Sequence, residues 1–353
     1  MEYRLLGRSG LKVSTITLGT MNFGRADPSK PLFNLGVKEA RRHLDVALDH
    51  GLNLIDTSDG YADGASEEII GEALEGRRDK VLIGTKCFNR LSPGPNGIGL
   101  SRYRIVACLE ASLKRLRTDY VDLYQAHKWD GQTPVEEFME AFDRLIRDGK
   151  VRYIGSSNFS GWHVMKCLGV SERDGRERFV SQQICYTLHS REAEHELVPI
   201  AVDQGLGLLV WGPLAGGLLS GKFRRGKDSP AGSRHSGYKW HSPPVHDWEK
   251  LFDIVEELVA VAEARGVSAA QVALAWLLSR PGVTSAIVGA RNDAQLADNL
   301  AAADLKLSAD ELSRLEKVSR PPLPYPYWHQ LMMNKERFGP ADLALHAPYM
   351  TEN

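Results

Sequence analysis

Several features that would mark other classes of protein are scarce or missing in this sequence. Among its 353 residues only four cysteines occur, namely Cys87, Cys108, Cys167 and Cys185. They include no CxxC pair and have no nearby histidine at ligand spacing, which argues against a disulfide framework and against a zinc site. We therefore expect no metal, and the low cysteine usage favours a reducing, cytoplasmic location.

Long apolar runs and a surplus of one charge are absent as well. No stretch approaches the ~20 apolar residues that a membrane span requires. Residues 1–14 also lack the apolar core of a signal peptide. The 44 basic residues nearly balance the 45 acidic ones, for a formal net charge of −1. A nucleic-acid or anionic-membrane partner usually requires a basic surplus, so we expect neither partner.

The sequence does contain a regular alternation of two hydrophobic periods. Short apolar runs without polar alternation indicate strands buried on both faces, as in a parallel sheet. Eight runs qualify as strands: Ile16–Gly19, Leu52–Ile55, Val81–Ile83, Val121–Tyr124, Val151–Ile154, Phe179–Gln183, Leu206–Val210 and Thr284–Val288. Between them lie longer stretches with helical spacing, which is clearest in Lys38–Asp49, Arg102–Leu116 and Val135–Arg147.

Eight strand–helix units predict an α/β fold, a closed (β/α)8 TIM barrel, with the whole chain as a single domain. Two apolar runs, Tyr3–Leu6 and Leu11–Ser14, flank a Gly-Arg-Ser-Gly turn and predict an N-terminal β-hairpin. The segment Lys222–Trp248 is predicted to be a long loop at the carboxyl face of the barrel. The barrel core should cover about residues 15–320. Because prolines follow Arg320, we expect a tail over 321–353 without regular structure, lying over the barrel or at an interface.

Four side chains that carry chemistry stand at or just after the ends of consecutive predicted strands. Asp56 ends the second strand, Lys86 the third and His127 the fourth, and Tyr61 lies in the loop after Asp56. Each alone has an ordinary explanation, such as a helix cap or a rim aromatic. Active sites of such barrels form at the carboxyl ends of the strands, so the coincidence of all four favours one catalytic site.

This set of residues suits the donation of a proton to an oxygen that becomes negative. A free tyrosine has a pKa near ~10, which is too high for an efficient acid at neutral pH. We expect the ammonium of Lys86 to lower the pKa of Tyr61, and the carboxylate of Asp56 to hold Lys86 in place. His127 would orient a carbonyl oxygen or assist the movement of the proton.

Five segments resemble the aldo-keto reductase family, in the right order and over nearly the whole chain. They are Leu-Gly-Thr-Met-Asn-Phe-Gly at 18–24, Ile-Asp-Thr-Ser-Asp-Gly-Tyr at 55–61, Gly-Thr-Lys at 84–86, Ser-Leu-Lys-Arg-Leu-Arg-Thr-Asp-Tyr-Val-Asp-Leu-Tyr at 112–124 and Ile-Gly-Ser-Ser-Asn-Phe at 154–159. The segment 211–222 is similar to the bacterial branch that includes potassium-channel beta-subunit-like and aryl-alcohol dehydrogenase-like members. The resemblance implies a catalytic tetrad of Asp56, Tyr61, Lys86 and His127, with Tyr61 as the general acid.

The resemblance also implies a nicotinamide cofactor in the barrel mouth, in place of a Rossmann domain. Carried over by position, the cofactor-binding residues are Ser157, Asn158 and Gln183 for the carboxamide; Trp211 for the ring; Gly19, Thr20, Met21 and Asp56 near the ribose and nicotinamide; Pro213, Leu214, Gly217 and Lys222 for the pyrophosphate; and Gly289, Arg291, Gln295 and Asn299 for the adenine end. At the start of the eighth helix, Arg291 is placed to bind a 2′-phosphate, which favours NADPH (NADP+). Asp293 lies close by and leaves NADH as the alternative.

Aromatic residues are the candidates for the substrate pocket. We expect Phe23, Phe88 and Trp129 to line it, whereas Trp240 and the run Tyr325–Trp328 would serve equally well in lining, loop packing or a subunit contact.

The function expected from these features is NADPH-dependent reduction of an aldehyde or ketone to the alcohol. The partner would be a small carbonyl compound that the sequence does not identify, and the chain would be a monomer or a homo-oligomer. One alternative is an NADPH-binding regulatory or partner subunit with little turnover. A metal-dependent barrel hydrolase is disfavoured, because His127 has no histidine partner on the neighbouring strands.

Overall fold

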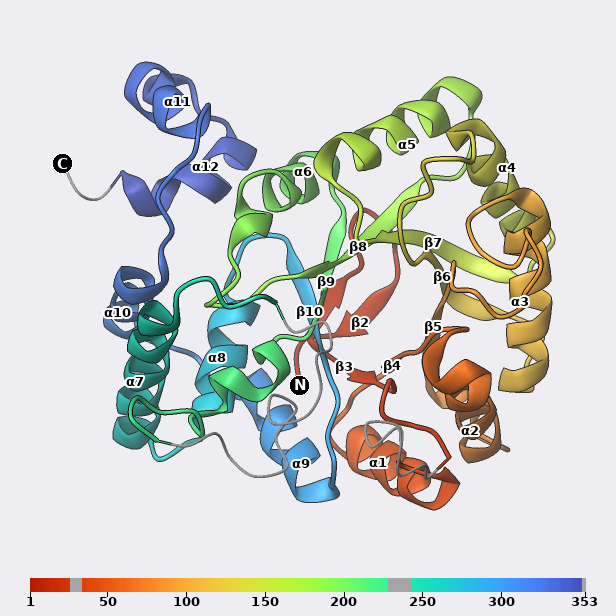
Figure 1. The fold of residues 1–353 in the computed structure, drawn as a ribbon, viewed down its shortest axis with the longest axis horizontal. Helices are drawn as coiled ribbons and strands as arrows, with labels where there is room; N and C mark the ends of the chain where they lie inside the picture. The colour runs from red at the N-terminus through yellow and green to blue at the C-terminus, as the bar shows by residue number, and fades with distance from the viewer. Residues whose placement is uncertain (26–33, 228–242, 351–353) are drawn as a thin grey trace.

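The centre of the molecule is a closed barrel of eight parallel strands. The computed structural model describes residues 1–25, 34–227 and 243–350. Around the barrel the strand order is β10-β3-β4-β5-β6-β7-β8-β9 (Figure 1). The strands are β3 (Ile16–Gly19), β4 (Leu54–Asp56), β5 (Leu82–Cys87), β6 (Val121–Ala126), β7 (Val151–Ser157), β8 (Phe179–Cys185), β9 (Gly207–Trp211) and β10 (Val283–Val288). The predicted (β/α)8 TIM barrel is confirmed, and each predicted strand overlaps one observed strand.

Amphipathic helices surround the barrel. In α4 the side chains of Val135, Phe138, Phe142 and Leu145 are buried at helical spacing, and the face they form packs toward the strands. The α-helices before the tail are α1 (Val37–Asp49), α2 (Ala65–Ala73), α3 (Arg102–Leu116), α4 (Val135–Arg147), α5 (Gly161–Asp174), α6 (Leu197–Gln204), α7 (Trp248–Arg265), α8 (Ala269–Leu278), α9 (Asp293–Ala301) and α10 (Ala309–Ser319). Short 3-10 turns are η1 (Tyr61–Gly64), η2 (Arg78–Lys80), η3 (Glu192–Glu194), η4 (Ala215–Ser220) and η6 (Ala302–Asp304).

Two of these helices are additions to the outer ring. After β9 the chain forms both α7 and α8, and after β10 it forms both α9 and α10. α7 packs against α8 and against α10, so α7 and α10 make a second layer on one side of the barrel (Figure 1). In the part of the chain that the structure describes, no single helix is long and apolar enough to span a membrane. The consecutive helices α7 and α8, bent by 101°, meet that test of length and composition only when taken together.

The predicted N-terminal hairpin is present and closes the amino-terminal end of the barrel. Its strands β1 (Tyr3–Leu5) and β2 (Lys12–Ser14) pair antiparallel. Side chains of the hairpin and of four barrel strands form one buried cluster: Leu6, Val13, Leu54, Leu123, Leu209 and Ile287. Since this end of the barrel is plugged, the opposite end, where the strands finish, is the open one.

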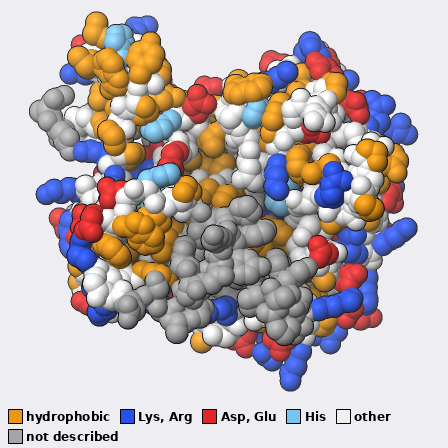
Figure 2. Space-filling model, viewed as in Figure 1, with side chains coloured by type: hydrophobic (Ala, Val, Ile, Leu, Met, Phe, Trp, Pro, Cys, Tyr) orange, Lys and Arg blue, Asp and Glu red, His pale blue; other side chains and the backbone are white. Residues whose placement is uncertain are grey.

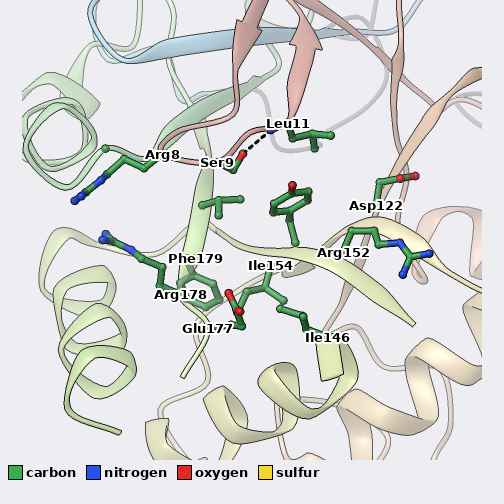
Figure 3. Close-up of a pocket in the computed structure, with 13 residues that line it drawn as sticks. Arg8, Ser9, Leu11, Asp122, Ile146, Arg152, Ile154, Glu177, Arg178 and Phe179 are labelled. Carbon is green, nitrogen blue, oxygen red and sulfur yellow. Dashed lines mark hydrogen bonds between the residues drawn. The ribbon is translucent and has the colours of Figure 1, made fainter. Parts of the chain in front are cut away.

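A cavity of 510 Å³ lies at the plugged end (Figure 3). The hairpin turn contributes Arg8, Ser9 and Leu11 to its lining, and Leu11 N donates a hydrogen bond to Ser9 Oγ (3.2 Å). The other walls include Arg152 at the start of β7 and Arg178 just before β8. This cavity is therefore far from the strand ends that carry the candidate catalytic residues.

The tail is helical from Tyr327 onward, which corrects the expectation of no regular structure over 321–353, whereas residues 321–326, which contain the prolines of the run, form no helix or strand. It contains α11 (Tyr327–Asn334), η7 (Lys335–Arg337), α12 (Pro340–His346) and η8 (Ala347–Tyr349). Pro326 is the N-cap of α11 and Pro340 begins α12, and at a helix start the missing N–H of proline costs no intrahelical hydrogen bond.

The tail packs beside α6 at the outer edge of the barrel (Figure 1). The ring of Tyr327 stacks on His195 with centroids 5.5 Å apart. Apolar side chains nevertheless gather on its surface, where Tyr325 and Met332 are 74% and 71% exposed (Figure 2). Among the alternatives for the tail aromatics, Tyr327 thus serves in packing.

Candidate active site

The carboxyl ends of the strands form the rim on which the candidate residues meet. Because the strands are parallel and paired in register, Gly19 lies opposite Asp56, Lys86 opposite Gln125, and Ser157 opposite Gln183. Each strand brings one predicted residue to this rim: Gly19 on β3, Asp56 on β4, Lys86 on β5, His127 after β6, Ser157 on β7, Gln183 on β8, Trp211 on β9 and Gly289 after β10.

A chain of polar contacts links Asp56, Lys86 and Tyr61. Lys86 is fully buried, and its Nζ donates to Asp56 Oδ1 (2.5 Å), to the carbonyl oxygen of Thr57 (2.8 Å) and to Tyr61 Oη (3.2 Å). A buried ammonium requires such partners, because an unpaired charge in the interior is strongly unfavourable. The ammonium therefore uses its three hydrogens on a carboxylate, a carbonyl and the phenol oxygen.

Burial and the neighbouring charges shift the pKa values of Lys86 and Tyr61. Burial alone would lower the pKa of Lys86, but the Asp56 carboxylate and the Tyr61 phenol outweigh it, so the pKa of Lys86 lies above its ordinary value. Burial raises the pKa of Tyr61, and Lys86 offsets only part of this rise. The sequence led us to expect a net lowering for Tyr61. That expectation was wrong, because the desolvation of the phenolate outweighs the attraction of the lysine.

The second carboxylate oxygen of Asp56 is held by two glutamines. Gln183 Nε2 donates to Asp56 Oδ2 at 2.8 Å, and Gln125 Nε2 donates to the same oxygen at 3.3 Å. The sequence interpretation missed Gln125, although a signal was available. Gln125 lies two residues before His127, so its side chain points to the same side of β6, and a polar residue inside a buried strand requires a partner.

His127 follows β6 and lies beside Tyr61. The two ring centroids are 6.0 Å apart in an edge-on arrangement. Burial lowers the pKa of His127 well below its ordinary value, and the cations of Lys86 and Lys128 add to this effect. The imidazole is therefore neutral at physiological pH. Its Nδ1 is 3.2 Å from both Ser58 Oγ and Asn89 Nδ2, two contacts that we did not predict from the sequence.

Asn158 connects His127 to Trp211. Its backbone is left-handed (φ 57°), a conformation that asparagine tolerates better than most residues. Asn158 Nδ2 donates to the His127 carbonyl oxygen and to Ser157 Oγ, and Trp211 Nε1 donates to Asn158 Oδ1, all at 3.0 Å. A second lone pair of Oδ1 is left to accept from a carboxamide, so the predicted role of Asn158 is compatible with this geometry.

A second cavity, of 590 Å³, adjoins Asn158 and Trp211. Phe159 and Cys185 contribute to its lining, together with Pro243. In contrast to the cavity at the plugged end, this one lies at the open end of the barrel, next to the predicted site.

The glycine-rich segment after Trp211 fits a phosphate group. Four of its glycines have positive φ: Gly212 (61°), Gly216 (67°), Gly217 (103°) and Gly221 (77°). Successive amides in such conformations form a concave anion-binding backbone. A Cβ added at Gly217 would meet no atom of the described residues 1–25, 34–227 and 243–350 within 4 Å. Of the other residues predicted here, Leu214 is half-buried, Pro213 is buried and Lys222 is exposed.

The predicted adenine end lies at the start of α9. Arg291 is exposed, and its backbone N–H donates to Gln295 Oε1 (3.0 Å). Asn299 is buried, and its Nδ2 has no hydrogen-bond partner among the residues that the structure describes. An unpaired buried donor of this kind fits a ligand that supplies an acceptor, as a purine does. One carboxylate oxygen of Asp293 accepts from Arg42 Nε (3.1 Å), and the other lies 3.3 Å from His43 Nε2.

The three residues predicted to lie on the ribose side differ in their burial and in their contacts. Thr20 is fully buried, and its hydroxyl bonds to the Asp56 carbonyl oxygen (3.1 Å) and to Ser66 Oγ (3.0 Å). A Cβ at Gly19 would lie 2.8 Å from Ile287 Cγ2, so packing against β10 explains this glycine. Only Met21 has a half-exposed side chain.

The three predicted substrate-pocket aromatics lie in different surroundings. Phe23 is 1% exposed and belongs to the main core, an environment that does not favour a lining role. Phe88 is half-buried beneath Lys128, whose Nζ is 5.7 Å from the ring centroid. Trp129 stacks on His163 with centroids 3.9 Å apart. Trp240 lies outside the described residues.

Among the residues that the structure describes, no three His, Cys, Asp or Glu side chains are grouped so that they could hold a metal ion. The polar groups that converge at the open end of the barrel are instead a phenol, an ammonium, a carboxylate and a neutral imidazole. Such a set can donate a proton and can stabilise charge on an oxygen.

Comparison with known proteins leads to the same family. Residues 15–320 match the model of the Aldo/keto reductase family. The chain is 42% identical over 331 residues to "Uncharacterized oxidoreductase YrpG" of Bacillus subtilis, covering 90% of this chain and 96% of that protein. It is 37% identical over 337 residues to "Probable voltage-gated potassium channel subunit beta" of Arabidopsis thaliana, covering 93% of this chain and 100% of that protein. It is 35% identical over 348 residues to "Versiconal hemiacetal acetate reductase" of Aspergillus parasiticus, covering 92% of this chain and 99% of that protein. The chain therefore belongs to the aldo/keto reductase family and is an NAD(P)H-dependent oxidoreductase.

Proposed function

We propose that this protein uses NADPH to reduce an aldehyde or ketone to the alcohol, with Tyr61 as the general acid. The observation that carries the proposal is the buried contact chain from Asp56 through Lys86 to Tyr61, beside a neutral His127 at the open end of the barrel. The nicotinamide would supply a hydride to the carbonyl carbon. Residues of the protein would donate the proton and stabilise the negative charge that develops on the oxygen.

The direction of the Lys86–Tyr61 hydrogen bond makes the proton of Tyr61 available. Lys86 has only hydrogens to give, so Tyr61 Oη accepts from it (3.2 Å) and its own hydrogen points elsewhere. The raised pKa keeps Tyr61 protonated at neutral pH. An alkoxide is a stronger base than a phenolate, so transfer from Tyr61 to the reduced oxygen remains favourable.

The other members of the tetrad support this step. As the proton leaves Tyr61, the ammonium of Lys86 stabilises the phenolate, and Asp56 keeps the ammonium in position. His127 is neutral and would donate a hydrogen bond to the carbonyl oxygen, which fixes its orientation.

A second candidate function is supported by one relative. The similarity to a protein named as a potassium channel beta subunit favours an NADPH-binding regulatory role with little turnover. Oxidation of NADPH by the purified protein, assayed against a panel of aldehydes and ketones with identification of the alcohol, separates the two. Formation of an alcohol supports the reductase. Tight NADPH binding without turnover on any carbonyl would favour the regulatory role.

We also expect Arg291 to determine the preference for NADPH. Arg291→Ala should weaken NADPH binding by about 10–100-fold, because a charge-assisted contact with the 2′-phosphate is lost. NADH binding should change by no more than about twofold. Dissociation constants from the fluorescence of the bound nicotinamide test this, with Arg102→Ala, an exposed arginine on α3, as the control. An equal loss for both cofactors contradicts the assignment.

A further inference from the structure

Asn89, three residues after Lys86, contacts the nitrogen of His127 that the proposed reaction does not use. Asn89 Nδ2 lies 3.2 Å from His127 Nδ1, and Lys128 Nζ donates to Asn89 Oδ1 at 3.1 Å. The backbone of Asn89 is also anchored, because Arg104 Nη2 of α3 donates to its carbonyl oxygen (2.7 Å). The amide therefore stands between a cation and the imidazole.

The donor and acceptor chemistry of Lys128 leaves one orientation of the Asn89 amide. An ammonium can only donate, so the oxygen of the Asn89 amide faces Lys128 and its NH2 faces His127. An amide NH2 can also only donate, so Nδ1 of His127 must accept. Ser58 Oγ, also 3.2 Å from Nδ1, gives its single hydrogen to Asp59 Oδ1 (3.0 Å), so it could only accept from Nδ1. Ser58 therefore favours the opposite tautomer and competes with Asn89 for Nδ1.

The packing around Asn89 restricts its movement. Gly60, which precedes Tyr61, lies so close that a Cβ there would be 2.4 Å from Asn89 Nδ2. The loop that carries the proposed proton donor therefore packs directly on the amide that contacts His127. A side chain larger than hydrogen at position 60 would displace the amide.

The charged groups around His127 keep the ring neutral. Lys86 faces it from β5 and Lys128 follows it in the chain, and both cations, with burial, lower its pKa. The phenol of Tyr61 is next to the ring. On this side the carboxylate of Asp59 accepts from Ser58 Oγ (3.0 Å), which in turn lies 3.2 Å from His127 Nδ1. A neutral ring with an accepting Nδ1 carries its single proton on Nε2.

We propose that Asn89, oriented by Lys128, is a positioning residue that holds His127 in the tautomer with the proton on Nε2. This inference rests on the proposed carbonyl reduction. In this tautomer Nε2–H donates to the carbonyl oxygen, whereas in the other tautomer a lone pair on Nε2 would face that oxygen and repel it.

Asn89→Asp should reverse the preferred tautomer of His127, while the side chain at position 89 keeps almost the same shape. The carboxylate can only accept, so it draws the proton to Nδ1 and also raises the pKa of His127. Above that pKa, kcat for carbonyl reduction should fall on the order of 10²-fold while the Kd for NADPH stays within about twofold. Below that pKa the imidazolium again carries a proton on Nε2, so activity should recover as the pH falls, whereas the wild type shows no such rise.

The tautomer itself is measured by ¹⁵N NMR of the His127 ring in the intact protein. We expect the Nε2–H pattern in the wild type and the Nδ1–H pattern in Asn89→Asp at high pH. Asn89→Leu removes the donor and leaves Ser58 Oγ as an acceptor, so the Nδ1–H pattern should appear there as well. Asn96→Asp makes the same chemical change at an exposed site of the same loop and should alter neither the spectrum nor the pH profile.

Two results would overturn the proposal: an Nδ1–H pattern in the wild type, or an Nε2–H pattern retained in both Asn89→Asp and Asn89→Leu. Asn89→Leu also serves as the deciding variant where Asn89→Asp does not fold. Because the spectrum requires no turnover, a protein with the expected tautomers but no carbonyl reduction would refute the proposed function and leave the assignment of Asn89 standing.

Discussion

Replacement of Tyr61 by phenylalanine should lower kcat by about 10²–10⁴-fold, the range that positioned proton donors contribute. Phenylalanine keeps the ring that packs edge-on against His127 and removes only the hydroxyl that accepts from Lys86. Binding of NADPH should stay within about twofold of the wild type, since the proton donor matters only in the chemical step. Steady-state kinetics together with cofactor titration measure both quantities.

A matched control separates the loss of this hydroxyl from the general effect of a Tyr→Phe change. Tyr103 on α3 is 70% exposed, and Tyr103→Phe should leave kcat unchanged. Retained turnover in Tyr61→Phe would eliminate Tyr61 as the proton donor. A parallel loss of NADPH binding would instead indicate that the ring supports the cofactor site.

Replacement of Lys86 by methionine should abolish turnover and destabilise the fold. Lys86 is fully buried and Asp56 is 3% exposed, so in the described part of the chain the substitution leaves a buried carboxylate whose remaining side-chain donors are Gln183 and Gln125. Removing one partner of a buried ion pair typically costs about 3–5 kcal/mol. We expect the free energy of unfolding, measured by urea denaturation, to fall by this amount.

The double variant Asp56→Asn/Lys86→Met is the control for this prediction. With the carboxylate removed, no buried charge is left unpaired, so most of the lost stability should return. Activity should not return, because the group that stabilises the Tyr61 phenolate is still absent. A double variant no more stable than Lys86→Met would contradict the account of the ion pair.

The sequence predicted the barrel well and the ends of its strands poorly, and both results have physical reasons. The predicted bounds of β3, α3 and α4 agree with the structure, since hydrophobic periodicity and a cap such as Ser101 mark them locally. The observed β5 and β6 extend beyond the predicted Val81–Ile83 and Val121–Tyr124. The additional residues include Lys86 and Gln125, which are polar because the site requires them, so a rule based on hydrophobicity stops too early.

In the candidate site, too, some residues could be predicted from the sequence and others could not. Asp56, Lys86 and His127 could be found because the ends of parallel strands meet at one edge. Asn89 could not, because its contact with His127 depends on how two loops from different strands pack, and no local pattern encodes that. The raised pKa of Tyr61 was also missed, since the sequence contains the charge of Lys86 but not the depth of burial.

The central claim is that residues at the open end of this barrel reduce a carbonyl group. It is tested most directly by incubating the protein with an aromatic aldehyde and NADPH that carries deuterium at both C4 positions of the nicotinamide, and then analysing the alcohol by mass spectrometry. The account predicts one deuterium on the former carbonyl carbon of each alcohol molecule with the wild type and almost no alcohol with Tyr61→Phe. Unlabelled alcohol, or equal amounts of labelled alcohol from both proteins, would contradict it.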